Sequence, residues 1–262
     1  MDRQLREHAR ARDAGDPSAR LRLLDARLRA GELTGPRIQL AAFLGHGDSR
    51  AVLGSDAPDL PGSVFQLMGG LIEHDWALCL WAATRGVDRV LPLYEEVHPA
   101  NPDPRNSLEA LHAWLHGTRP LVLDSAEAEA EEQLLAEHCE AALDYSIQTH
   151  EVQRFLSDTP PFATDPEGAA AYAIRALHRL HGAWVLWLRS DLHPAGMEAM
   201  ARESLEFAVR AVIARRVGIA HQRVAPGYDT RALAQEEAVR AEQELISVVV
   251  APIVGWLLAE QA

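Results

Sequence analysis

The side chains best suited to chemistry in this sequence are its histidines, of which there are 12. His112 and His116 are four residues apart in LEALHAWLHG, so a helix places both imidazoles on one face. Together with His74 they would supply the three protein ligands of a zinc site or of a metal-dependent helical-bundle enzyme. The glutamate that directly follows the first histidine in zinc-protease helices is absent, because the sequence reads His-Ala-Trp-Leu-His. A metal site is therefore one hypothesis beside ordinary core or surface histidines.

Nucleophilic and phosphate chemistry have weaker signals. Cys79 and Cys139 lie in apolar helical context, where a free cysteine is usually a small buried hydrophobic residue. No G-x-S-x-G motif occurs, and Gly45-His46-Gly47 and Gly69-Gly70 lack the strand–glycine–helix setting of a phosphate loop. All 25 basic residues are arginine, which excludes P-loop lysines and lysine Schiff bases. We therefore expect no enzymatic activity and no cofactor.

The charge of the chain is strongly acidic and unevenly distributed. The 38 acidic residues outnumber the arginines and give a net charge of -13, which disfavours nucleic acid and anionic membranes as partners. Residues 119–165 contain 11 acidic residues and only 2 arginines, so this segment carries -9 of the total. A basic protein is the partner that this charge distribution favours.

The acidic side chains of this segment are spaced to share a helix surface. Between Arg119 and Arg154 the sequence has nine carboxylates and no arginine. The candidate partner-binding residues among them are Glu129, Glu132, Glu137, Glu140 and Asp144. One interpretation is a solvated helix face that aids solubility, and the other is a docking surface for a basic partner.

Helical signals run along nearly the whole chain and predict an all-α fold, a multi-helix bundle or array. Asp-Pro pairs that suit the start of a helix occur at Asp16-Pro17, Asp103-Pro104 and Asp165-Pro166, and Asp229-Thr230 suits the start of the last long helix. Leu21, Leu24 and Leu28 have the spacing of one apolar helix face. The only candidate strand is SVVVAPIV, which fits a buried helix equally well.

The proline- and glycine-containing loop SDAPDLPG, residues 55–62, is the best domain boundary in the sequence. It separates a small helical module over 1–56 from a main all-α domain over 63–262. The longest apolar run, Leu245 to Leu258, has 14 residues, fewer than the roughly 18 that a membrane-spanning helix needs. With a charged start and no signal-peptide pattern, the chain is expected to be cytoplasmic and to have no membrane partner.

Residues 76–117 resemble a known family. The sequence has Trp81-Ala82, then VLPLYE over 90–95, then PDPR over 102–105, and then LEALHAW over 108–114. This order of elements resembles the all-helical immunity proteins, class five, of bacterial polymorphic toxin systems. The N-terminal stretch LRLLDARLRAGELTGPRIQLAAFLGHGDSRAVLG is similar to short helical modules common in myxobacteria.

The resemblance implies a bacterial protein that binds and neutralises a toxin in a toxin–antitoxin type of system. A basic nuclease toxin would meet the acidic surface, because nucleases use positive charge to hold phosphates. We therefore expect an immunity-like protein with a basic protein toxin as its partner. The alternatives are the metal-dependent helical-bundle enzyme that uses the paired histidines and a non-catalytic helical scaffold module.

Overall fold

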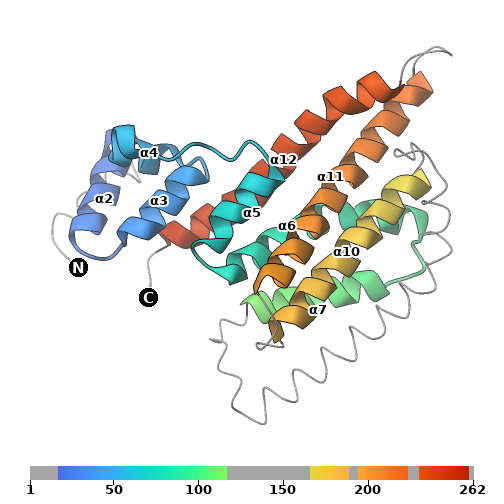
Figure 1. The fold of residues 1–262 in the computed structure, drawn as a ribbon, viewed down its shortest axis with the longest axis horizontal. Coiled ribbons are helices and arrows are strands. Elements are labelled where there is room, and N and C mark those ends of the chain that lie inside the picture. The colour runs from blue at the N-terminus through green and yellow to red at the C-terminus, as the bar shows by residue number, and fades with distance from the viewer. Residues whose placement is uncertain (1–16, 117–165, 189–193, 224–229, 260–262) are drawn as a thin grey trace, which may run out of the picture. The chain divides into compact units, whose positions relative to one another are not determined.

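The computed structural model describes residues 17–116, 166–188, 194–223 and 230–259. Over these residues the chain forms nine α-helices and one short 3-10 helix, with no strand (Figure 1). The all-α prediction is confirmed, and SVVVAPIV is helical. The chain divides into two compact units, residues 1–75 with 250–262, and residues 76–249.

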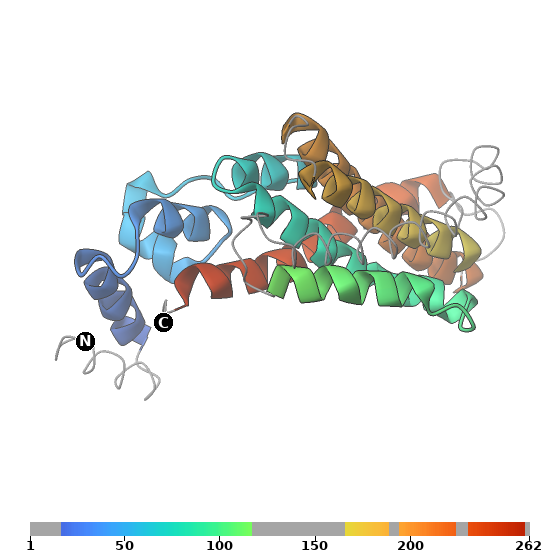
Figure 2. The same cartoon turned by 90° about the horizontal axis from the view of Figure 1, so that it is seen from below.

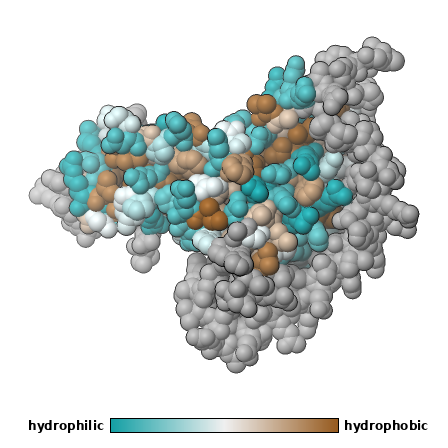
Figure 3. Space-filling view, viewed as in Figure 1, coloured by the Kyte–Doolittle hydropathy of each residue, from teal (hydrophilic) through white to brown (hydrophobic). Residues whose placement is uncertain are grey.

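The first unit contains four short α-helices, one 3-10 helix and the end of the last long helix. They are α2 (Pro17–Arg29), α3 (Gly35–Phe43), α4 (Gly47–Leu53), the 3-10 helix η1 (Gly54–Asp56), α5 (Val64–Ile72) and the final turns of α12 (Thr230–Leu258). Their shared core is built on the buried side chains Leu24, Leu33 and Ile38, against which Leu258 also packs. Figure 3 shows apolar residues on the viewed face as separate patches among hydrophilic ones.

The helix starts and stops of this unit follow from local residue chemistry. Gly31 has a φ of 73°, the left-handed conformation that commonly ends a helix and that glycine adopts without strain. The Ser63 hydroxyl accepts a 3.2 Å hydrogen bond from the Gln66 amide at the start of α5. Arg50 fixes the loop after η1 to α3, because its guanidinium donates to the carbonyls of Ala42 at 3.2 Å and Pro58 at 2.5 Å.

The division into units differs from the boundary that the sequence suggested at residues 57–62. Helix α5 lies beyond that loop but belongs to the first unit, where it packs on α3. A side chain on Gly70 would overlap the Phe43 ring, so the absence of a Cβ allows this approach. The last turns of α12 also belong to the first unit. A single boundary along the sequence cannot describe a unit made of two separate segments.

Arginine side chains, rather than a glycine, bind the last carbonyls of α12. Arg27 is only 7% exposed and donates to the carbonyls of Leu258 at 2.8 Å and Ala259 at 3.3 Å. Arg37 lies over the Trp256 ring at 5.2 Å and donates to its carbonyl at 3.4 Å. These positive groups satisfy carbonyls that have no partner within the helix and complement its dipole.

We expect Arg27→Gln to lower the free energy of unfolding by about 2 kcal/mol, because a buried charged donor to carbonyls is lost. Arg29→Gln on the same helix is the control, since Arg29 is 78% exposed and its ion pair with Asp25 is a surface pair worth about 0–1 kcal/mol. Urea denaturation followed by circular dichroism measures both. Equal losses in the two variants would contradict the capping role.

The second unit has a core of three long helices. They are α6 (Trp76–Val97), α10 (Pro166–Leu188) and α11 (Pro194–Arg223), which pack pairwise, while α7 (Asp103–His116) packs on α6 and α10. Both ribbon views show α10 and α11 side by side (Figures 1 and 2). Two glycines permit close helix approach, because a Cβ on Gly86 would overlap Leu205 and one on Gly182 would overlap Met200. Pro92 lies inside α6.

Helix α12 joins this unit through an apolar seam and an ionic network. Ala241 packs with the buried Ile213 and Val217 of α11. Glu244 accepts from Arg89 of α6 at 3.0 Å and also from Arg216 of α11. The hydrogen bond from Arg89, followed by that from Arg216, lowers the pKa of the Glu244 carboxyl. The network therefore ties three helices of the second unit through a carboxylate that stays ionised at neutral pH.

Helix α12 also contains the one described stretch that is long and apolar enough to cross a membrane, Gln235–Leu258. This test uses length and composition only, and a core helix of a soluble protein passes it as well. The uninterrupted apolar run Leu245 to Leu258 is shorter than this stretch, which also includes the charged turns before Leu245. Cytoplasmic location stays a prediction.

Candidate functional site

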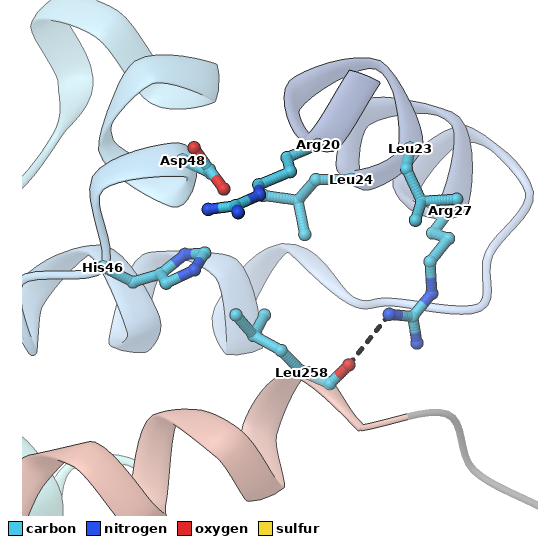
Figure 4. Close-up of a pocket in the computed structure, with 7 residues that line it drawn as sticks. All are labelled: Arg20, Leu23, Leu24, Arg27, His46, Asp48 and Leu258. Carbon is cyan, nitrogen blue, oxygen red and sulfur yellow. Dashed lines mark hydrogen bonds between the residues drawn. The ribbon is translucent and has the colours of Figure 1, made fainter. Parts of the chain in front are cut away.

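A cavity of about 240 Å³ lies within the first unit, bounded by α2, the start of α4 and the end of α12 (Figure 4). The apolar part of its lining is formed by Leu23, Leu24 and Leu258, and the polar part by Arg20, Arg27, His46 and Asp48. Leu23 and Leu24 are buried and face the core of the unit. The cavity therefore offers both an apolar wall and polar groups, the usual composition of a small-molecule site.

His46 is held in the cavity wall by its role as the N-cap of α4. Its ring Nδ1 accepts a hydrogen bond from the Ser49 amide at 3.2 Å and lies 2.8 Å from the Ser49 hydroxyl. Burial lowers the pKa of His46 below its usual value, and the negative charge of Asp48 opposes this shift. The ring is therefore neutral at pH 7, and because Nδ1 accepts, the proton lies on Nε2.

The charged groups at the cavity differ in how they are bound. Both terminal nitrogens of Arg27 donate to the α12 carbonyls, and its Nε lies 3.5 Å from Glu32. Arg20 and Asp48 point toward one another in Figure 4, yet neither forms an ion pair within 4.0 Å with any residue that the structure describes. Arg27 is thus a structural part of the wall, whereas Arg20 and Asp48 are available to a ligand.

A serine and a histidine also meet in the second unit, but in a different setting. The Ser107 hydroxyl of α7 lies 2.5 Å from Nε2 of His181 on α10, and both side chains are buried. Burial, and then the charge of His178, lower the pKa of His181 to about 4. The ring is neutral at pH 7 and forms a hydrogen bond with the hydroxyl. Because both groups are sealed in the core, this pair satisfies buried polar atoms and does not form an accessible nucleophile.

The predicted metal ligands are only partly described. His112 of α7 has its Nε2 3.9 Å from a carboxylate oxygen of Asp88, in an arginine–carboxylate network. In that network Arg105 binds Glu95 through two nitrogens, at 2.7 and 3.0 Å. His74 is exposed and follows α5 in the first unit, while the side chain of His116 lies outside the described residues.

No three metal-binding side chains (His, Cys, Asp or Glu) gather in a metal-sized cluster within the parts of the chain that the structure describes. What the structure places beside His112 is therefore a carboxylate that already binds Arg105. The site of His74, His112 and His116 stays a prediction.

All five acidic residues predicted to bind a partner, Glu129, Glu132, Glu137, Glu140 and Asp144, lie outside the described residues. In the described helices, many acidic residues form ion pairs with arginines. Their ion pairs across helices are Arg105–Glu95, Arg105–Asp88, Arg215–Glu96, Arg179–Glu203, Arg216–Glu237, Arg216–Glu244 and Arg89–Glu244. Among the described residues of the second unit, carboxylates are thus often paired with arginines of a neighbouring helix.

Comparison with protein-family models, with curated proteins and with solved structures found no match to this chain. Sequence reasoning also missed the cavity of the first unit. It treated Gly45-His46-Gly47 only as a failed phosphate loop, because histidine is not among the residues usually found at an N-cap. Arg20 and Leu258 lie at opposite ends of the chain, and only the tertiary fold brings them to one cavity.

Proposed function

We propose that this chain is a non-catalytic binding protein that captures a basic protein, in the manner of an immunity protein that neutralises a toxin. The observation that carries the proposal is the segregation of charge. Residues 119–165 hold 11 acidic residues against 2 arginines, whereas residues 166–262 hold 11 against 10. Selection for solubility alone has no need to gather the surplus in one segment.

The ion pairs of the described helices support this interpretation. Where carboxylates and arginines both occur, as in α6, α11 and α12, they pair across helix interfaces. Between Arg119 and Arg154 there is no arginine in the sequence, so the nine carboxylates there have no arginine neighbour along the chain. Arginines and lysines of a partner would supply the missing positive charge.

The expected chemistry of the partner follows from this surplus. A nuclease-type toxin carries a positive surface that holds phosphates, and an array of carboxylates competes for that surface. Complementary charge also raises the association rate to about 10⁸–10⁹ M⁻¹s⁻¹ at low salt. Salt should therefore slow association strongly, since the interacting charges are screened.

We expect the combined reversal of Glu129, Glu132, Glu137 and Glu140 to arginine to weaken binding of the partner by at least about 100-fold, because attraction becomes repulsion. The first measurement is growth of host cells in which proteins encoded beside this chain's gene are induced one by one, with and without the chain. A relieved growth arrest identifies the partner, and calorimetry of the purified pair gives the affinity.

The matched control reverses Asp56, Asp59, Glu109 and Glu236, which are exposed and lie outside the acidic segment. Both variants change the net charge equally, so a difference between them separates a specific surface from overall charge. If the chain relieves no growth arrest caused by a neighbouring gene, the immunity role is overturned. Equal binding by the two variants would overturn the acidic interface.

A further inference from the structure

The cavity of the first unit has two opposite charges in its lining, the exposed Arg20 and the half-buried Asp48. The Arg20 guanidinium and the Asp48 carboxylate both reach it, from α2 and α4, and point toward one another (Figure 4). No ion pair within 4.0 Å joins them to each other or to another described residue. A ligand with one negative and one positive group would satisfy both.

A ligand with a single charge fits these groups less well. A simple carboxylate would bind Arg20 but would lie beside the Asp48 carboxylate, and a simple amine would bind Asp48 but would lie beside Arg20. Like charges at short range are destabilising, so each would lose part of what it gains. The pair of residues therefore selects for a zwitterion.

His46 adds a hydrogen-bond donor to the lining of the cavity. Its Nδ1 is committed to the Ser49 amide, and its neutral ring therefore presents an N–H at Nε2. A carboxylate bound to Arg20 can accept this hydrogen bond, whereas an ammonium group cannot. His46 therefore gives the cavity a preferred orientation for a zwitterionic ligand.

The remaining wall and the size of the cavity define the rest of the ligand. Leu23, Leu24 and Leu258 form an apolar surface beside the charged groups. The volume of about 240 Å³ is smaller than the roughly 300–1,000 Å³ of sites for drug-sized ligands. About eight water molecules occupy this volume in the liquid, so the cavity suits a ligand with about nine non-hydrogen atoms.

We propose that this cavity binds a small zwitterion with an apolar group, of the class of aliphatic α-amino acids. The carboxylate binds Arg20 and the His46 Nε2–H, the ammonium group binds Asp48, and the aliphatic group packs on the three leucines. This site is separate from the acidic segment and from its basic partner. It adds a small-molecule site to the first unit.

The test titrates the full chain with L-leucine and follows binding by calorimetry and by ligand-observed NMR. For a ligand of this size we expect a Kd of about 0.1–1 mM. Two further probes each lack one charge: 4-methylpentanoate has no ammonium group, and 3-methylbutylamine has no carboxylate. Each should bind at least about 10-fold more weakly than leucine, because one charge-assisted hydrogen-bonding partner is lost.

Variants assign the two charges. Arg20→Gln should weaken leucine binding at least about 10-fold, and Asp48→Asn should abolish the preference for leucine over 4-methylpentanoate. His46→Asn retains an N-cap acceptor but lacks the Nε2 donor, and should weaken leucine and 4-methylpentanoate alike. Arg29→Gln and Asp56→Asn make the same chemical changes at exposed sites outside the cavity and should leave binding unchanged.

Three results would overturn the proposal. Absence of leucine binding at 10-fold above the expected Kd range would exclude the ligand class. Equal affinity for leucine and 4-methylpentanoate would make the cavity a carboxylate site without a role for Asp48. Unchanged binding by Arg20→Gln would place the leucine elsewhere. None of these outcomes depends on the toxin partner, because the assay contains only this chain.

Discussion

Replacing Trp184 by alanine should lower the free energy of unfolding of the second unit by about 3–5 kcal/mol. Trp184 is fully buried on α10, the helix that packs against both α6 and α11. Removing the indole takes away a large apolar area and leaves a void that the surrounding helices fill only in part. A loss of this size is a large fraction of the stability of an ordinary domain.

The measurement is urea denaturation followed by circular dichroism, with Trp184→Phe as the conservative variant. Trp256→Ala is the matched control, since Trp256 is 48% exposed and lies in the first unit. Its contacts include the stacked Arg37, which is worth about 0.5–1 kcal/mol. A loss for Trp184→Ala no larger than that for Trp256→Ala would show that α10 is not at the centre of the core.

Helix existence and many helix starts were predictable because they depend on residues next to one another. Asp103 and Pro104 begin α7, and Pro166 begins α10, as the Asp-Pro pairs predicted. The start of α4 has no such pair: the helix begins at Gly47 with His46 as its cap. A histidine ring that accepts through Nδ1 is an unusual cap, so residue type alone did not reveal it.

The packing of the units was not predictable, because it depends on residues far apart in the chain. Arg27 binds a carbonyl 231 positions away, and no local pattern marks that pairing. Gly70 and Gly86 are ordinary helical glycines in the sequence, and only the tertiary fold shows Phe43 and Leu205 lying against them. The cavity at Arg20 and His46 is formed by the same long-range packing, so the sequence predicted the fold class but not this site.

The second large effect is expected on acidification and comes from His181. Its pKa is about 4 in the folded protein, below the usual histidine value of 6.5, because burial disfavours the imidazolium. Above pH 6.5 the ring is neutral in both states and contributes no pH dependence. As the pH falls from 6.5 to 4, the unfolded chain binds a proton that the folded chain does not, so stability falls.

Integrated over this range, the shift corresponds to about 3 kcal/mol of stability lost by pH 4. His181→Gln removes the titration while keeping a hydrogen-bonding partner for the Ser107 hydroxyl, so we expect it to lose about 3 kcal/mol less than the native chain between pH 7 and pH 4. Comparing each protein with itself at pH 7 cancels the cost of the substitution, and other titrating groups contribute equally to both.

Parallel stability curves for the native chain and His181→Gln would show that the His181 proton is not excluded from the folded state. Ser107→Ala gives an independent check on the same pair. Without the hydroxyl, Nε2 has lost its hydrogen-bonding partner, and we expect about 1–3 kcal/mol of destabilisation at pH 7, where the ring is neutral. The steep decline below pH 6.5 should persist in that variant, because burial, the larger cause of the pKa shift, is unchanged.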